Sequence, residues 1–141
     1  MLIYGWANPM SNKNVPSETQ EQIALFEWAD LQCNKHPELR LMFHVPNEGK
    51  RSVVMGRMMK RMGLKQGVPD VILPVPKGRY HGLAIEMKSL KGRPTGAQLN
   101  WIDNLRAVGW RAEVCHGCVE AVEVIRAYLA GLCQRSDDRI C

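Results

Sequence analysis

The sequence predicts a small α/β domain with a mixed sheet of about four strands flanked by helices. Amphipathic segments with helical spacing alternate with short apolar segments typical of strands, in the order α, β, α, β, β, α, β, α. The length of 141 residues, with 45% hydrophobic and 23% charged residues, suits one ordinary globular domain. No internal repeat suggests a solenoid instead.

The first predicted helix begins at Ser17 and runs to about residue 34. Ser17 and Gln20 have the spacing of a capping box, in which each side chain accepts a hydrogen bond from the other residue's backbone. Residues 1–16 lack periodicity, so we interpret them as an N-terminal arm. The arm is followed by a domain that we place at residues 17–131.

A strand and a second helix are predicted next. Residues 39–45 form an apolar run that favours a strand. Ser52 is a candidate N-cap for the helix that follows, and Gly63 would end it. We interpret the four methionines of this helix as core residues, because flexible Met side chains often fill gaps between elements.

The middle of the chain predicts a β-hairpin with strands at 70–75 and 83–88. Thr95 and Gln98 form another capping box, which opens a helix ending near residue 108. A last strand at 110–115 and a last amphipathic helix at 119–131 complete the domain. The polar residues 132–141 are expected to form a flexible tail.

The charge pattern suggests a polyanionic partner. The formal net charge is +5, and no acidic residue lies between positions 50 and 65. A solvated helix face could have the same composition, but phosphate contacts would explain why every charged residue in this segment is positive. The candidate nucleic-acid-binding residues are Lys50, Arg51, Arg57, Lys60 and Arg61, with Lys91 and Arg93 in the loop after the hairpin.

Other broad classes have little support in the sequence. No apolar run reaches the roughly 18 residues that a membrane-spanning helix needs, and no secretion signal is recognisable. Five scattered cysteines without such a signal suggest free thiols in the cytoplasm. Cys115 and Cys118 form a C-x-x-C pair, but Cys133 and Cys141 have the wrong spacing to complete a zinc site with it. A redox function for the pair would not explain the charged residues Asp70, Glu86 and Lys88 of the hairpin.

The hairpin carries charges where a core would be expected. Glu86 and Lys88 lie two residues apart on one strand, so their side chains share a face. Asp70 starts the partner strand, and antiparallel pairing brings it to the same end of the hairpin. Solvent-facing strand residues could follow the same spacing. The apolar residues around them would instead desolvate these charges, which favours a pair or a bound metal.

Four motifs occur in order along the chain: Glu18-x-x-x-Gln22, Gly-Val-Pro-Asp ending at Asp70, Glu86-Met-Lys88, and Gln98 at the start of a helix. This set resembles the VRR-NUC family of virus-type replication-repair nucleases, within the PD-(D/E)-x-K superfamily, and its small phage-type members in particular. The resemblance implies a restriction-endonuclease-like fold and a structure-selective, metal-dependent DNA endonuclease of phage or viral replication, recombination or repair.

The residue types suit that chemistry. Hydrolysis of a phosphodiester needs a nucleophilic water and neutralisation of developing negative charge, and Mg²⁺ or Mn²⁺ held by carboxylates supplies both. The resemblance implies that the cation is held by Asp70 and Glu86, with Glu18 and the Met87 carbonyl. Lys88 would orient the water, Gln98 would contact the water or a phosphate, and Gln22 would support Glu18. Glu21, one turn further along the helix, remains an alternative to Glu18.

The resemblance also bears on assembly and on the alternatives. Phage-type members look like compact dimers, so we expect a homodimer that acts on branched or duplex DNA. Candidate interface residues are Ile3, Tyr4, Trp6, Tyr128 and Leu129, each of which could equally belong to the core. A non-catalytic nucleic-acid-binding module of the same fold is the alternative function, although such a module would not need all of Asp70, Glu86 and Lys88.

Overall fold

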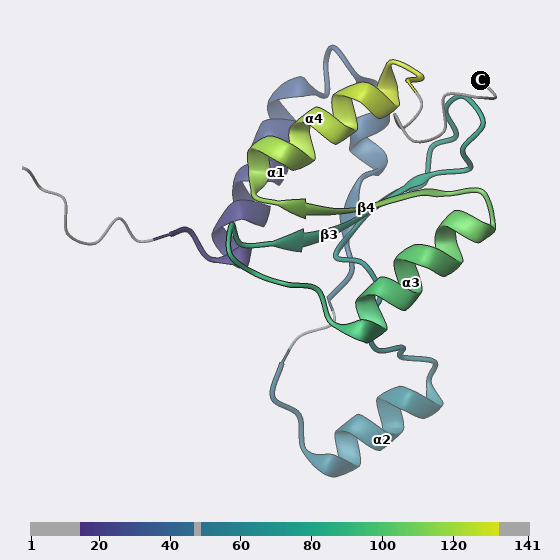
Figure 1. Cartoon of the computed structure of the whole chain (residues 1–141). Helices are drawn as coiled ribbons and strands as arrows, with labels where there is room; N and C mark the ends of the chain where they lie inside the picture. The colour runs from purple at the N-terminus through teal and green to yellow at the C-terminus, as the bar shows by residue number, and fades with distance from the viewer. Residues whose placement is uncertain (1–14, 47–48, 133–141) are drawn as a thin grey trace, which may run out of the picture.

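The computed structural model describes residues 15–46 and 49–132. Its centre is a mixed sheet of four strands in the order β1 (Phe43–His44), β2 (Val71–Leu73), β3 (Leu83–Lys88) and β4 (Arg111–His116). The pairs β1–β2 and β2–β3 are antiparallel, and β3 and β4 are parallel. The predicted α/β class and mixed sheet are therefore confirmed (Figure 1).

Helices cover both faces of this sheet. Helices α1 (Glu18–Gln32) and α4 (Cys118–Leu129) pack on one face, and α3 (Gly96–Ala107) packs on the other (Figure 1). The larger core cluster joins α1 and α4 to Leu83, Ile85 and Met87 of β3. The smaller cluster contains Ala84, Ile102 and Ala112 and lies on the α3 side. Side chains of β3 thus alternate between the two cores, as the strand period requires.

The predicted helix starts are confirmed by their capping boxes. Ser17 Oγ accepts from the backbone N–H of Gln20, and Gln20 Oε1 accepts from the backbone N–H of Ser17. Thr95 and Gln98 make the same reciprocal pair at the start of α3. These signals are reliable because they lie within four residues and need no tertiary partner.

The predicted strand at 39–45 is mostly wrong. Residues Pro37–Leu41 form a 3₁₀ helix, and only Phe43 and His44 join the sheet. Pro37 stands at the first turn, where its fixed φ favours a helical conformation. Strand β2 is also shorter than predicted and ends before Pro74, since proline cannot donate a ladder hydrogen bond.

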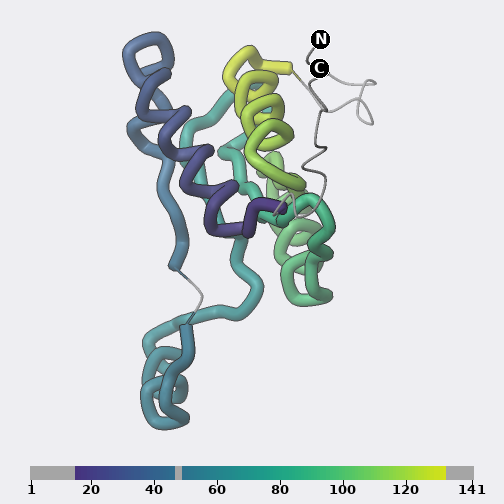
Figure 2. The backbone as a smooth tube through the Cα atoms, turned by 90° about the vertical axis from the view of Figure 1, so that its left-hand side faces the viewer, coloured from purple at the N-terminus to yellow at the C-terminus, as the bar shows by residue number. Residues whose placement is uncertain are grey.

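Helix α2 (Val53–Arg61) projects from the body of the molecule (Figures 1 and 2). Ser52 caps it, as predicted, by accepting from the backbone N–H of Met55, and Gly63 follows its end with φ 102°. The prediction that its methionines are core residues is wrong, because no residue of α2 is buried and Met62 is 78% exposed. The spacing of apolar residues predicts which side of a helix is apolar but not whether an element covers it.

Two further expectations concern the ends of the domain. Tyr128 is fully buried and donates a hydrogen bond to the Val75 carbonyl at 2.5 Å, so it is a core residue and not a surface for a partner. Leu129 is partly buried against the same core. Ile3, Tyr4 and Trp6 lie outside the described residues, as does the tail from 133.

Within the described residues, no helix is both long and apolar enough to cross a membrane.

Candidate active site

The turn before β2 delivers Asp70 to β3. Val71 pairs with Ile85, which places Asp70 opposite the Glu86–Met87 end of the strand. Asp70 Oδ2 accepts from the backbone N–H of Met87 at 2.8 Å. Gly67 lets this turn pack closely on α3: its φ is 80°, and a Cβ there would lie 2.7 Å from the backbone of Ala97. The predicted convergence of Asp70 with the Glu-Met-Lys segment is therefore present.

Glu86 and Lys88 are buried, with exposed fractions of 1% and 5%. Lys88 Nζ donates to Glu86 Oε1 at 2.7 Å. The interpretation of these two residues as ordinary solvent-facing strand residues is therefore wrong. A buried ion pair is expensive to desolvate and contributes little net stability, so a structural role alone explains it poorly.

Gln98 links the start of α3 to this ion pair. Its side-chain oxygen accepts from the Thr95 backbone, and its Nε2 donates to Glu86 Oε1 at 2.5 Å. The family resemblance implies that Gln98 contacts a water or a phosphate, and that role stays a prediction. What the structure adds is a contact between the Gln98 amide and the Glu86 carboxylate. The capping-box pattern placed Gln98 at the helix start, but only the tertiary fold shows that Glu86 lies next to it.

The two glutamates of α1 have different surroundings. Glu18 Oε1 lies 3.5 Å from Lys88 Nζ. Glu18 also lines a pocket of about 140 Å³ whose other lining residues are Thr19, Gln22, His44, Pro46, Asp70 and Met87. Glu21 instead accepts from the backbone N–H of Cys118 at 2.7 Å, at the start of α4. The geometry thus groups Glu18 and Gln22 with Asp70 and assigns Glu21 to capping.

Burial perturbs the charges of the site. Desolvation, reinforced by the charge of Asp70, raises the pKa of Glu86 to about 7, although the hydrogen bond and charge of Lys88 oppose this shift. For Lys88, burial alone would lower the pKa. The hydrogen bond to Glu86 and the charges of Glu86, Glu18 and Asp70 outweigh burial and raise the pKa of Lys88, which keeps the ammonium protonated.

The donor set can be tested against a divalent cation. Glu86 Oε2 is buried and, among the described residues, has no protein hydrogen-bond partner, so this face of the carboxylate could accept a cation. The described residues contain no group of three or more His, Cys, Asp or Glu side chains that would form a closed metal cage. Mg²⁺ is commonly held by one or two carboxylates together with waters, so Asp70 and Glu86 fit such an ion.

The surroundings of Cys115 and Cys118 disfavour redox chemistry. Burial raises the pKa of the Cys115 thiol, and burial together with Glu21 raises that of Cys118. Both shifts disfavour the thiolate, which is the reactive form. Cys133 and Cys141 lie outside the described residues.

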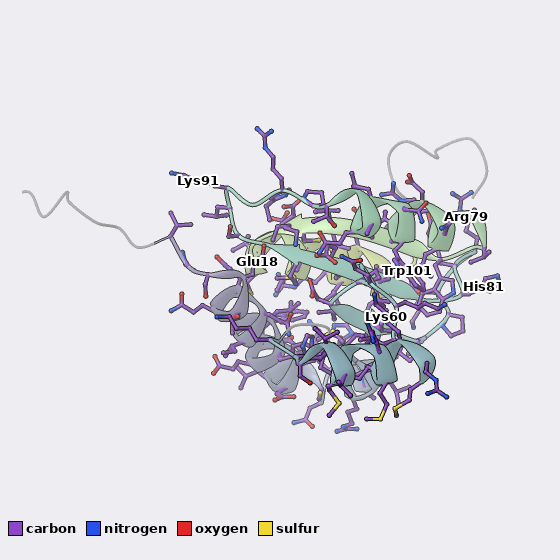
Figure 3. All side chains as sticks on the ribbon, turned by 90° about the horizontal axis from the view of Figure 1, so that it is seen from below. Glu18, Lys60, Arg79, His81, Lys91 and Trp101 are labelled. Carbon is purple, nitrogen blue, oxygen red and sulfur yellow. The ribbon has the colours of Figure 1, made fainter. Side chains whose placement is uncertain are left out.

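The predicted basic residues lie in two places. Lys91 and Arg93 are exposed in the loop after β3, and Figure 3 shows Lys91 at the same end of the molecule as Glu18. Arg57, Lys60 and Arg61 are exposed on α2, and Figure 3 labels Lys60 among them. Lys50 and Arg51 precede that helix.

A mixed sheet whose central hairpin joins an aspartate to a Glu-x-Lys segment defines the restriction-endonuclease-like class of fold. A family model for the VRR-NUC domain matches residues 16–118. One solved structure, described as a VRR_NUC domain protein, is 31% identical with a TM-score of 0.72 and covers 83% of this chain and 91% of its own. A search of curated proteins finds no match. The chain belongs to the VRR-NUC family, a nuclease-type family.

Proposed function

We propose that the chain is a Mg²⁺- or Mn²⁺-dependent DNA endonuclease that hydrolyses phosphodiester bonds at the pocket beside Asp70. One observation carries the proposal most strongly. Glu86 is buried next to Asp70 and Lys88, yet Glu86 Oε2 has no partner among the described residues. An unsatisfied buried carboxylate oxygen is costly, and a cation would satisfy it.

Each side chain has a distinct role in this proposal. Asp70 and Glu86 would hold the cation, helped by Glu18 and the Met87 carbonyl. A bound divalent cation lowers the pKa of a water and neutralises charge on the phosphate. Lys88 keeps its ammonium protonated and fixed against Glu86, so it can donate hydrogen bonds to a phosphate oxygen or orient the attacking water. Gln98 acts through Glu86 by fixing the orientation of its carboxylate.

The DNA partner is supported by family membership and by the exposed basic residues. The likeness to phage-type members further suggests structure-selective cleavage in phage or viral DNA replication, recombination or repair. A panel of labelled duplex, nicked, flap and four-way-junction DNAs with Mg²⁺, Mn²⁺ or EDTA tests the activity. We expect endonucleolytic products only with a cation and most rapidly on a branched substrate. Tight binding without cleavage on every substrate would favour the non-catalytic module.

The same proposal includes a homodimer, with α2 as its contact surface. Tyr128 is unsuited because it is buried. The apolar side of α2 is exposed, from 44% for Met55 to 78% for Val54 and Met62, with Met58 at 49%. Apolar side chains gathered on one projecting helix are typical of a surface that a partner covers. A second copy would also place two active sites on one DNA, as paired strand cuts require.

Light scattering at micromolar concentration tests this surface. We expect a wild-type mass near twice 16.0 kDa, and a monomer after Val54→Glu combined with Met58→Glu, because each charge would be buried in the contact. Leu31→Glu, at an 81% exposed apolar residue of α1, is the matched control and should leave the mass unchanged. A wild-type mass of 16 kDa with full activity would contradict the dimer.

A further inference from the structure

The loop after β3, residues 89–94, carries Lys91 and Arg93 and is tied to the end of β4. His116 is the last residue of β4 and pairs with Lys88 in the parallel register. The His116 ring nitrogen Nε2 lies 3.1 Å from the Gly92 carbonyl oxygen. A carbonyl can only accept a hydrogen bond, so Nε2 carries the hydrogen and donates it to Gly92.

On its other side, the loop rests on the candidate site. The Gly92 backbone N–H donates to the Ser89 carbonyl at 3.0 Å, which closes a tight turn. A Cβ built at Gly92 would lie 3.3 Å from Glu18 Oε1 and 3.0 Å from Ser89 Oγ. Gly92 therefore lies close to the Glu18 carboxylate, and its carbonyl oxygen contacts the His116 ring.

His116 is itself held by two backbone contacts. Its own N–H donates to Glu120 Oε2 at 2.6 Å, in the first turn of α4. The following residue, Gly117, donates its N–H to the Lys88 carbonyl at 2.9 Å. The backbone on both sides of the ring is therefore fixed beside Lys88, which makes His116 a suitable anchor for the loop.

We propose that His116 is a positioning residue of the nuclease. Its Nε2–H holds the 89–94 loop closed against Glu18, which keeps Lys91 and Arg93 at the mouth of the site and limits the movement of the Glu18 carboxylate. The part of this inference that concerns DNA rests on the proposed function. The closure of the loop does not, because it can be measured in the absence of metal and DNA.

Trypsin reports the closure of this loop directly. The Lys91–Gly92 bond is a trypsin site inside the turn, whereas trypsin cuts poorly after Arg93 because Pro94 follows it. His116→Phe keeps a ring but removes the donor, and His116→Gln keeps a donor at a similar reach. We expect His116→Phe to be cut after Lys91 about fivefold faster than wild type, because loss of one hydrogen bond raises the open population by about that factor.

The controls separate a local from a global effect. His116→Gln should be cut at the wild-type rate, and so should His81→Ala, whose ring lies at the opposite end of the molecule (Figure 3). The thermal midpoint of every variant is measured in the same buffer, so that general unfolding is recognised. Equal cutting of His116→Phe and wild type would overturn the proposal. Cutting of His116→Gln as fast as His116→Phe would overturn it as well.

A second measurement addresses DNA. Affinity for a fluorescently labelled duplex in EDTA should fall about fivefold in His116→Phe and stay at the wild-type value in His116→Gln. The double variant Lys91→Ala with Arg93→Ala should lose no further affinity when His116→Phe is added to it. If the wild-type chain binds no DNA, the proposed function fails while the proteolysis result still decides the role of His116. If the chain binds DNA but the loop is cut equally in all variants, only the positioning role fails.

Discussion

Gln98 donates a hydrogen bond to Glu86 at 2.5 Å, and the same Gln98 side chain closes the capping box of α3. One residue therefore fixes both the start of a helix and the orientation of the buried carboxylate. Gln20 has the same capping role on α1 and does not line the pocket beside Asp70. The same substitution at Gln98 and at Gln20 therefore separates the effect of the helix cap on stability from the effect of the Glu86 contact on catalysis.

We expect Gln20→Ala to lower the free energy of unfolding by about 1 kcal/mol, because it removes a capping contact. Gln98→Ala should lower it further, because it also removes the hydrogen bond to the buried Glu86 carboxylate. Only Gln98→Ala should also slow DNA cleavage, by about tenfold, because Glu86 loses a hydrogen bond to a charged group. Denaturant titrations and single-turnover cleavage rates of both variants measure the two effects. Equal cleavage rates for the two variants would show that Gln98 is only a cap.

Removal of Lys88 should affect both turnover and the proton affinity of Glu86. Lys88→Met should slow cleavage by about 100-fold or more, because the phosphate and water lose a fixed ammonium. Lys88 lowers the pKa of Glu86, so its removal should raise that pKa above about 7 and weaken Mn²⁺ binding at neutral pH.

The binding defect, but not the turnover defect, should recover in alkaline buffer, where Glu86 ionises without Lys88. Calorimetric Mn²⁺ titrations below and above neutrality measure the recovery. The control is Lys77→Met, which breaks the ion pair with Glu38 away from the pocket and should change neither property. Unchanged turnover in Lys88→Met would remove Lys88 from the chemistry.

The stability of the metal-free protein should depend on the titration of Glu86. Its pKa is raised from 4.5 to about 7 in the folded chain, so the folded state binds the proton more tightly than the unfolded state. This contribution to stability is fully present below pH 4.5 and is lost as the pH rises through about 7.

Glu86→Gln resembles the protonated carboxyl at every pH. The variant should therefore match wild type in acid and become more stable than wild type above neutrality, by up to about 3 kcal/mol. Urea unfolding in EDTA across this pH range provides the test. A stability difference that stays constant with pH would contradict the raised pKa.

DNA binding should depend on salt through the basic residues of α2. Changing Arg57, Lys60 and Arg61 together to Ala should lower the slope of log K against log salt by about 0.9 for each phosphate that the variant no longer neutralises, on any DNA sequence. Lys35, Arg40 and Arg126, changed together, remove the same charge from other exposed positions and serve as the control. Equal slopes for both triple variants would mean that net charge alone matters.

Local signals predicted most of the fold. Both capping boxes and the hairpin lie within short stretches of chain, and the hairpin register alone brings Asp70 beside the Glu-Met-Lys segment. Errors arose where a single residue overrides a pattern. Pro37 and Pro74 shorten the strands that the apolar runs around them predicted.

Contacts between distant elements were beyond the reach of the sequence. The periodicity of α2 predicted an apolar side but could not show that nothing in the described chain buries it. Likewise Tyr128 could have been core or surface until its hydroxyl was found against Val75. The contact between Gln98 and Glu86, and the separation of Glu18 from Glu21, depend on how α1 and α3 pack against opposite sides of the sheet.

The central claim is that Asp70 and Glu86 hold a cation that phosphodiester hydrolysis requires. Its most direct test is single-turnover cleavage of one labelled DNA, with Mn²⁺ and with EDTA, by wild type, Asp70→Asn and Glu86→Gln. The control is Glu38→Gln, which removes an ion-paired carboxylate outside the pocket. We expect cation-dependent cleavage by wild type and Glu38→Gln, and a loss of at least about 100-fold in both site variants with DNA affinity in EDTA retained. Cleavage by either site variant at a rate near that of wild type, or cleavage by wild type in EDTA, would contradict the claim.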